Sequence, residues 1–206
     1  MQSYRQEGDV RYTSVARSVL VFFLTLYLLA VCCLSLMEGF VCAETGPGSK
    51  GSLFPNVVLR SQLPEQDRAY LGISRKRSIS LDDVHAKLII VEVFNTYCVI
   101  CLKNVPALNS IYSAIENDPR LKGTVKVVAV AVGNNLREVD AFRQEYKISY
   151  PVIEDPDFAL HKALGNPKVP YTIIVAKKAG LSLVIDTHQG VLDSAGGLLT
   201  KIRGLL

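Results

Sequence analysis

The chain has 206 residues, of which 49% are hydrophobic and 20% charged, and its formal net charge is +4. This length allows one domain or at most two, and the apolar content excludes a simple disordered chain. With 14 Gly and 9 Pro, collagen-like and low-complexity classes are excluded, and five cysteines are too few for a disulfide-dense mini-protein. The mild charge leaves no nucleic-acid footprint, so we expect no nucleic-acid partner.

The first feature along the chain is an apolar segment, residues 19–37, that contains no charged side chain. As a helix it would span about 28 Å, close to the hydrocarbon thickness of a bilayer. Arginines precede the segment and glutamates follow it closely. Because positive charge is retained on the cytoplasmic side, residues 1–18 are predicted to be cytoplasmic and the rest of the chain to lie outside.

Two interpretations of this segment remain open, a transmembrane helix or a signal peptide. Its length favours an uncleaved anchor, because the apolar core of a signal peptide is usually about 7–15 residues long. The sequence Val41-Cys42-Ala43 would instead allow cleavage after Ala43. A lipoprotein site at Cys32 is a weaker alternative, since Val31 is bulky for that pattern. We therefore expect a protein of the cell envelope, anchored in the inner membrane with its domain in the periplasm, or cleaved and soluble there.

Residues 38–52 are predicted to be a linker, and residues 53–206 are long enough for one domain with its own core. In chain order, the apolar patterns predict a strand at 87–94, a helix at 98–117, a strand at 124–132, a helix at 136–146, a strand at 150–153, a helix at 158–164, strands at 171–176 and 181–187, and a helix at 193–206. A hairpin turn is predicted at 177–180. This alternation predicts an α/β fold with helices on both faces of a central sheet.

A Cys-x-x-Cys pair, Cys98 and Cys101, stands between the first predicted strand and the helix that follows. At a helix start, Cys98 would meet unpaired backbone N–H groups and the positive end of the helix dipole, and both favour a thiolate. Cys101, one turn later, can attack a mixed disulfide and release the partner. The position predicts thiol–disulfide chemistry, with Cys98 attacking and Cys101 resolving.

Other uses of the two cysteines fit the sequence less well. A zinc site usually needs four ligands, and the histidines are scattered without a close pair, so no metal site is expected. A peroxide reductase needs Pro-x-x-x-Thr-x-x-Cys, but the residues seven and three before Cys98 are Val91 and Asn95. A peroxiredoxin-like enzyme and a non-catalytic binding or metal-delivery module remain as alternatives.

Together, these features resemble the thioredoxin fold, in particular the TlpA/ResA-like, AhpC/TSA-related thiol–disulfide oxidoreductases that are tethered to membranes. The matching landmarks are the Cys-x-x-Cys pair, Tyr97 where the family usually has Trp, Pro106 in the following helix, the loop Val169-Pro170-Tyr171-Thr172, and an additional helix and strand at about residues 136–153. The resemblance implies a thioredoxin-like mixed sheet, and a redox-active disulfide Cys98–Cys101 with no other cofactor.

The resemblance also implies roles for residues beside the cysteines. Pro170 matches the family's cis-proline, and X–Pro is the linkage at which a cis bond costs least. A cis bond there would expose the backbone of Val169 to a partner strand. Tyr97 would shape the binding surface around the first sulfur.

Glu92 matches a buried acid behind the active site of thioredoxins. Strand alternation gives it the same side-chain direction as Ile90 and Phe94. Burial would raise the pKa of its carboxyl and allow it to relay a proton to or from the second thiol. The alternative is a carboxylate that reaches solvent or pairs with a lysine. His161 and His188 are interpreted as surface or strand residues.

The predicted activity is thiol–disulfide exchange on exported proteins, with a membrane thiol as electron donor or acceptor. The residues between the cysteines, Val99 and Ile100, have no side-chain donor for the Cys98 thiolate. We therefore expect only a moderate decrease in the pKa of this thiol and a weak oxidant, which favours a reductase.

Overall fold

The computed structural model describes residues 20, 22–29, 46–74 and 77–206. The chain divides into two compact units, residues 1–44 and 45–206. In the first unit, residues 22–29 form a helix with exposed apolar side chains. The predicted cytoplasmic segment, both ends of the predicted membrane segment and the beginning of the linker lie outside the described residues. Among the residues that are described, no helix combines the length and the apolar character needed to span a membrane.

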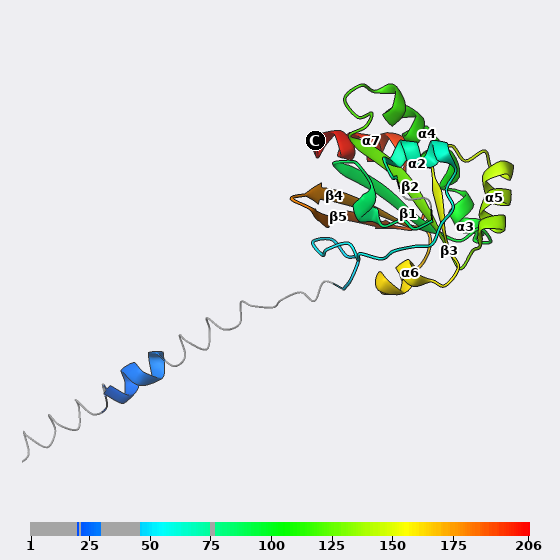
Figure 1. Ribbon diagram of the computed structural model, residues 1–206. Helices are drawn as coiled ribbons and strands as arrows, with labels where there is room; N and C mark the ends of the chain where they lie inside the picture. The colour runs from blue at the N-terminus through cyan, green and yellow to red at the C-terminus, as the bar shows by residue number, and fades with distance from the viewer. Residues whose placement is uncertain (1–19, 21, 30–45, 75–76) are drawn as a thin grey trace, which may run out of the picture. The chain divides into compact units, whose positions relative to one another are not determined.

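A five-stranded sheet with the order β3-β2-β1-β4-β5 forms the centre of the second unit (Figure 1). The strands are β1 (Leu88–Phe94), β2 (Val125–Val132), β3 (Val152–Asp155), β4 (Tyr171–Lys178) and β5 (Leu181–Gln189). β1, β2 and β3 are parallel, whereas β4 is antiparallel to both β1 and β5. β1 and β2 are buried along their whole length, in agreement with their mainly apolar sequences, which are interrupted by Glu92 and Lys126.

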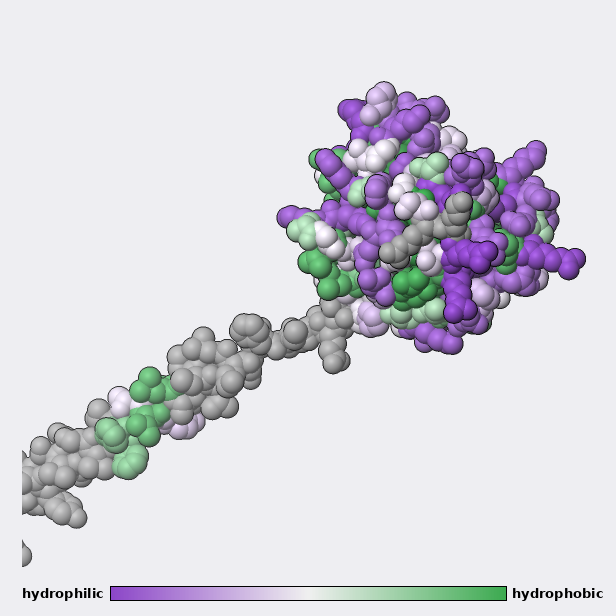
Figure 2. Space-filling model, viewed as in Figure 1, coloured by the Kyte–Doolittle hydropathy of each residue, from purple (hydrophilic) through white to green (hydrophobic). Residues whose placement is uncertain are grey.

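Helices cover both faces of this sheet, as predicted. They are α2 (Glu65–Leu71), α3 (Val99–Leu102), α4 (Val105–Asn117), α5 (Leu136–Glu145), α6 (Ala159–Ala163) and α7 (Ala195–Gly204), with a 3₁₀ turn, η1 (Leu81–Asp83). Side chains of α4, α5 and α7 pack on the face that carries the even-numbered residues of β1. α2, α6 and the segment before β1 pack on the opposite face. Figure 1 shows α4 and α7 together on one side of the sheet, and the view in Figure 2 shows a mainly hydrophilic surface around this core.

α2 also protects an edge of the sheet that the short β3 leaves open. β3 pairs only with residues 129–132 of β2. Beside the remainder of β2, the backbone N–H of Val127 donates to the Tyr70 hydroxyl at 2.9 Å, and the Lys126 ammonium lies 4.0 Å from the centroid of the Tyr70 ring. Burial raises the pKa of Tyr70. An open strand edge invites pairing with other chains, and α2 prevents this here.

The helix predicted over residues 98–117 is two helices, α3 and α4. Asn104 stands at the junction, and Pro106 occupies the second position of α4. The first N–H groups of a helix have no partner within it, so a proline there sacrifices no hydrogen bond. Pro106, one of the landmarks of the family resemblance, therefore stands directly after this break.

Most other predicted boundaries shift by one or two residues. The third strand runs over Val152–Asp155 and not over 150–153. The hairpin between β4 and β5 turns on Ala179 and Gly180 alone, with φ of 51° and 80°. Two consecutive residues with positive φ are characteristic of the type I′ turn, whose twist matches that of the strands it joins.

Candidate active site

Cys98 and Cys101 form a disulfide where the chain passes from β1 into α3, and their Cα atoms are 5.2 Å apart. Cys98 is the N-cap residue of α3, and its sulfur accepts the backbone N–H of Cys101 at 3.2 Å. Cys98 is half-buried, whereas Cys101 is 3% exposed. Cys98 is therefore the more accessible of the two residues, and the order of attack stays a prediction.

The short length of α3 weakens the helix-dipole effect that the sequence predicts at Cys98. A helix over residues 98–117 would have placed the end of a long dipole at Cys98, but α3 has only 4 residues. The charge effect of a helix end depends on its aligned peptides and its unpaired N–H groups. Stabilisation of a Cys98 thiolate therefore relies on the local N–H groups of one turn, and mainly on that of Cys101.

Two asparagines hold the loop that precedes Cys98. The Asn95 side chain donates to the Val132 carbonyl at 2.7 Å and accepts the Tyr97 N–H at 2.9 Å. The Asn134 side chain accepts the Thr96 N–H at 3.0 Å and donates to the Thr96 hydroxyl at 2.7 Å. The loop is thereby fixed to the carboxyl end of β2, which positions Cys98 at that edge of the sheet.

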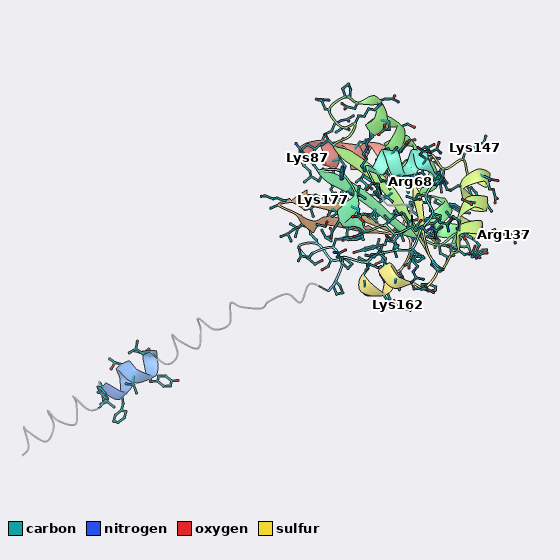
Figure 3. All side chains as sticks on the ribbon, in the orientation of Figure 1. Arg68, Lys87, Arg137, Lys147, Lys162 and Lys177 are labelled. Atoms are coloured by element: carbon teal, nitrogen blue, oxygen red, sulfur yellow. A yellow bond between two sulfur atoms is a disulfide. The ribbon has the colours of Figure 1, made fainter. Side chains whose placement is uncertain are left out.

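Exposed side chains surround the disulfide: Tyr97 is 73% exposed, Val99 73% and Ile100 54%. The Tyr97 hydroxyl donates to Glu138 Oε1 at 2.7 Å, and this bond raises the pKa of Tyr97 and lowers that of Glu138. Tyr97 and Glu138 also line an open cleft between the loop and α5. Arg137, another residue of this cleft, lies at the outer side of α5 (Figure 3).

The peptide bond between Val169 and Pro170 is cis, as the family resemblance implied. It directly precedes β4, and the Pro170 carbonyl accepts the Gly190 N–H at 2.9 Å. Val169 is half-buried and packs against the hydrophobic cluster that contains Cys101. Binding of a partner strand by the backbone of Val169 stays a prediction.

Glu92 is buried in the centre of the sheet, with 2% of its surface exposed, on the face predicted from strand alternation. Its Oε1 accepts from the Asn104 side chain at 2.9 Å, and its Oε2 accepts from the Thr172 hydroxyl at 2.6 Å. Burial raises the pKa of Glu92 from 4.5 to about 7, although the two hydrogen bonds oppose this shift. The burial excludes the alternative in which this carboxylate reaches solvent. A carboxyl with a pKa near neutrality can give or take a proton at physiological pH.

Asn104 is a buried site residue that no sequence motif indicated. Besides Glu92, its side chain donates to the Gly190 carbonyl at 3.3 Å and accepts the Leu192 N–H at 2.8 Å. It therefore joins the α3–α4 junction, the buried acid and the loop after β5. The signal in the sequence was a polar residue three positions after Cys101, within an otherwise apolar helical pattern.

Within the described ranges, no group of three or more His, Cys, Asp or Glu side chains is placed to hold a metal ion. The chemistry that the site offers is exchange between a thiol pair and a disulfide, which needs no other group to carry its two electrons. A buried acid nearby can manage the accompanying proton.

Comparison with known proteins finds a matching family and several relatives. The model of the AhpC/TSA family matches residues 61–187. The thiol-disulfide oxidoreductase ResA of Bacillus subtilis (strain 168) is 26% identical over 127 residues, which cover 62% of this chain and 62% of that protein. The protein of the same name from Geobacillus thermodenitrificans is 24% identical over 109 residues, 53% of this chain and 60% of the relative. The chain thus spans about three fifths of the length of these relatives.

Solved structures show the same fold. StoA from Bacillus subtilis has a TM-score of 0.51 and 21% identity, with coverage of 70% of this chain and 95% of that chain. The thioredoxin domain of a thiol-disulfide oxidoreductase from Bacteroides vulgatus has a TM-score of 0.57 and 16% identity, with coverage of 75% and 97%. At these identities the likeness shows the fold, which is thioredoxin-like.

Proposed function

This chain belongs to the AhpC/TSA family, and from that premise we propose that it is a thiol–disulfide oxidoreductase that reduces disulfides of exported proteins. The observation that carries the proposal is the Cys98–Cys101 disulfide at the start of α3, with an accessible first sulfur and a buried second one. The relatives named ResA support the same chemistry. The cis Val169–Pro170 bond and the buried Glu92 complete the set of groups expected around such a pair.

The reaction begins with the reduced pair. The Cys98 thiolate attacks one sulfur of a substrate disulfide, the other substrate sulfur leaves as a thiolate, and solvent protonates it. The Cys101 thiol then transfers its proton to the Glu92 carboxylate, and its sulfur attacks Cys98. The second substrate thiolate leaves and takes a proton from solvent. The substrate has gained two electrons and two protons, and the Cys98–Cys101 disulfide has formed.

A thiol electron donor in the membrane is proposed to return two electrons to the Cys98–Cys101 disulfide. The reductase direction is supported by the side chains between the cysteines, Val99 and Ile100, neither of which can donate a hydrogen bond to a thiolate. A less stabilised thiolate makes the reduced form less stable, and the pair becomes a poorer oxidant.

The proposed location is the cell envelope, on the evidence of the uncharged segment 19–37 and the arginines before it. The segment either anchors the chain in the inner membrane or is removed after Ala43. A topology reporter fused after Leu206 should be active on the outer side of the membrane. Activity confined to the cytoplasm would contradict this location.

The decisive assay for the activity is reduction of insulin disulfides by the chain in the presence of dithiothreitol. Replacement of Cys98 by Ser should abolish it. Equilibration of the pair with glutathione gives the direction, since a potential near about −270 mV indicates a reductant and one near about −120 mV an oxidant. If the chain consumes hydrogen peroxide but leaves insulin unreduced, a peroxide reductase replaces the proposal, and a metal that copurifies with the intact thiols would favour metal delivery.

A further inference from the structure

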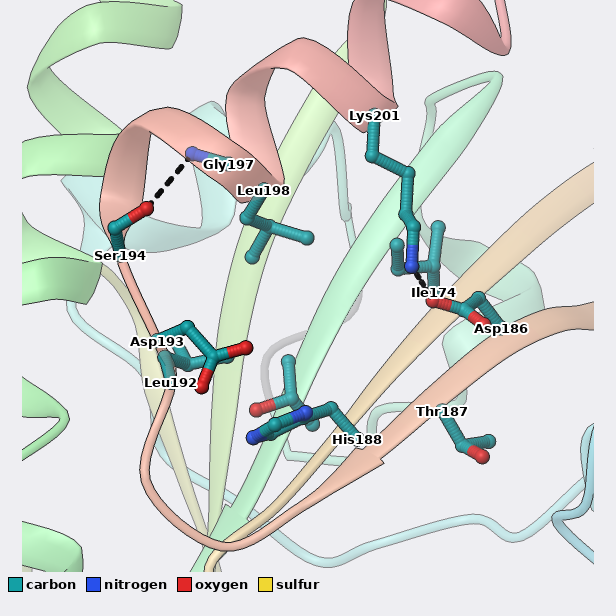
Figure 4. A pocket seen from close by; sticks show the side chains of 11 residues that line it. Ile174, Asp186, Thr187, His188, Leu192, Asp193, Ser194, Gly197, Leu198 and Lys201 are labelled. Atoms are coloured by element: carbon teal, nitrogen blue, oxygen red, sulfur yellow. Dashed lines mark hydrogen bonds and ion pairs between the residues drawn. The ribbon is translucent and has the colours of Figure 1, made fainter.

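We propose that Thr172 and His188 form the route by which protons pass between solvent and the buried Glu92. This inference rests on the proposed thiol–disulfide exchange and assigns the proton path of its resolving step. The route opens into a pocket between β4, β5 and α7, which we term the α7 pocket (Figure 4). Its lining includes Thr172, Asp186, His188, Asp193 and Lys201.

Glu92 needs a relay because it is almost fully buried and yet must exchange a proton in every catalytic cycle. Its two hydrogen-bond partners differ in what they can do. The Asn104 amide donates to Oε1 but does not give up its proton. The Thr172 hydroxyl donates to Oε2 and can accept another proton at the same time. Of these two contacts, only the hydroxyl can pass a proton onward.

Thr172 connects Glu92 to the α7 pocket. Its hydroxyl bonds Glu92 on one side, and the residue lines the pocket on the other. The pocket has a volume of about 130 Å³. That volume is sufficient for several water molecules, and the polar lining offers them hydrogen-bond partners. A proton on the Thr172 hydroxyl can therefore pass to a water molecule of the pocket in a single transfer.

His188 lies directly opposite Thr172 in the β4–β5 pairing. Side chains of such a pair project from the same face of the sheet, with Cβ atoms about 5 Å apart. Figure 4 shows the His188 imidazole within the pocket, pointing toward the segment that carries Asp193. The strand register thus places an imidazole, whose ring nitrogens can donate or accept a proton, beside the proposed relay hydroxyl.

The hydrogen bond of His188 shows which ring nitrogen is available to accept a proton. Nε2 lies 2.8 Å from the Val191 carbonyl. A carbonyl only accepts, so Nε2 carries hydrogen, and in the neutral ring Nδ1 is the acceptor. Nδ1 can therefore take a proton that arrives through Thr172 or a pocket water, while Nε2 keeps the ring in place.

The charged groups around His188 do not cancel its electrostatic effect on Glu92. On the same strand, Asp186 is ion-paired with Lys201 of α7, so these two charges largely compensate each other. Asp193, from the loop before α7, also lines the pocket. The charge of His188 lowers the pKa of Glu92. Protonation of the imidazole would thus make Glu92 release its proton more readily.

The proton balance of the resolving step follows. The Cys101 thiol gives its proton to Glu92 as its sulfur attacks Cys98. Glu92 then passes this proton to the Thr172 oxygen, while the hydroxyl hydrogen of Thr172 moves to a pocket water or to His188 Nδ1. Solvent removes it from there, and Glu92 returns to the carboxylate.

The test is the rate of the resolving step, measured by stopped-flow release of substrate from the Cys98 mixed disulfide between pH 5.5 and 8.5. Thr172→Val keeps the shape but removes the relay, so we expect at least a tenfold slower step near pH 7. Thr172→Ser keeps the hydroxyl and should remain within about twofold of the wild type. Thr200→Val is the matched control, because its hydroxyl bonds the Gly196 carbonyl on α7 and no part of the route.

A second variant makes the test independent of any folding defect in Thr172→Val. His188→Gln should shift the apparent pKa of the resolving step upward, because the positive charge that favours ionised Glu92 is lost. The inference is overturned if Thr172→Val resolves as fast as the wild type at every pH, if Ser and Val slow the step equally, or if His188→Gln leaves the pH profile unchanged. The proposed function fails separately, if the Cys98→Ser chain reduces insulin as well as the wild type does.

Discussion

Asn104 donates its side-chain amide to the Glu92 carboxylate at 2.9 Å, and this bond links the break between α3 and α4 to the buried acid. The same side chain holds Gly190 and Leu192 in the loop after β5. A movement of the active-site helices would therefore displace both the hydrogen-bond donor of Glu92 and Leu192, which helps to line the α7 pocket.

Replacement of Asn104 by Ala should weaken both connections. We expect a loss of about 2–3 kcal/mol in the free energy of unfolding, because the Gly190 carbonyl and the Leu192 N–H lose a buried partner. The pKa of Glu92 should rise further, since the bond from Asn104 lowers it. Urea unfolding and NMR titration of the Glu92 carboxyl measure the two effects.

The matched control is Asn109→Ala, also on α4. The Asn109 side chain donates to the Lys147 carbonyl and accepts the Ser149 N–H at the surface. This variant should lose less stability and leave the Glu92 titration unchanged. An unchanged Glu92 pKa in Asn104→Ala would show that the hydrogen bond from Asn104 does not affect the ionisation of Glu92.

Glu92 should make the stability of the oxidised protein depend on pH. Its pKa is about 7 in the folded chain, against 4.5 for the ordinary group, so between these values the folded state binds more protons than the unfolded state. The free energy of unfolding therefore falls as the pH rises from about 4.5 to 7, by about 3 kcal/mol in total from this group.

Glu92→Gln should remove this dependence. The amide can still accept from Asn104 and can donate to the Thr172 oxygen, so the hydrogen bonds are preserved. We expect the variant to be more stable than the wild type at pH 8, with the difference shrinking towards pH 5. Equal slopes of unfolding free energy against pH for the two proteins would rule out a raised pKa.

The α/β fold with helices on both faces could be predicted from sequence because β1 and β2 are mainly apolar and the segment between them has helical periodicity. α2 could not, because its 7 residues are too few to show a helical period. Its stability comes from contacts distant in sequence, including the ion pair between Asp67 and Arg143 at 2.7 Å and the Tyr70 hydroxyl at the edge of β2. Tertiary packing, more than helix propensity, holds short helices.

In the site, the Cys-x-x-Cys spacing indicated Cys98 and Cys101, whereas the family resemblance implied the roles of Glu92 and of the cis bond before Pro170. The contacts of Thr172 and His188 depend on the register between β1, β4 and β5, which no local pattern determines. From the sequence alone, His188 is therefore interpreted as a surface or strand residue. Its position opposite Thr172 becomes apparent only when the strands are paired.

The roles of the two cysteines can be separated by trapping. Cys101→Ala should accumulate mixed disulfides between Cys98 and its partners, because the accessible sulfur can attack but nothing resolves the product. Cys98→Ala should trap little, since Cys101 is buried. Non-reducing electrophoresis of the two variants measures the yield of adducts. A greater yield with Cys98→Ala would reverse the assignment.

The dipeptide between the cysteines is predicted to set the redox potential. Val99 and Ile100 are exposed and apolar, and the Cys98 sulfur accepts from the Cys101 backbone N–H. With only one short helical turn behind this donor, we expect the pKa of the Cys98 thiol to lie moderately below about 8.5 in the reduced protein. Thiolate absorbance at 240 nm measures it, and a pKa below about 5 would indicate an oxidant instead.

Replacement of Val99-Ile100 by Pro-His should raise the potential. Proline is tolerated at the first position of a helix, and the extended backbone of Cys98, with ψ of 105°, is compatible with a following proline. A histidine beside the thiolate stabilises the reduced form, and a tenfold decrease in the equilibrium constant for oxidation corresponds to about 30 mV. Equilibration with glutathione should show an upward shift of at least that size, while Ala-Ala at the same positions serves as the control and should shift the potential less. If Pro-His has no effect, Tyr97, Glu92 or Pro170 sets the potential in place of the dipeptide.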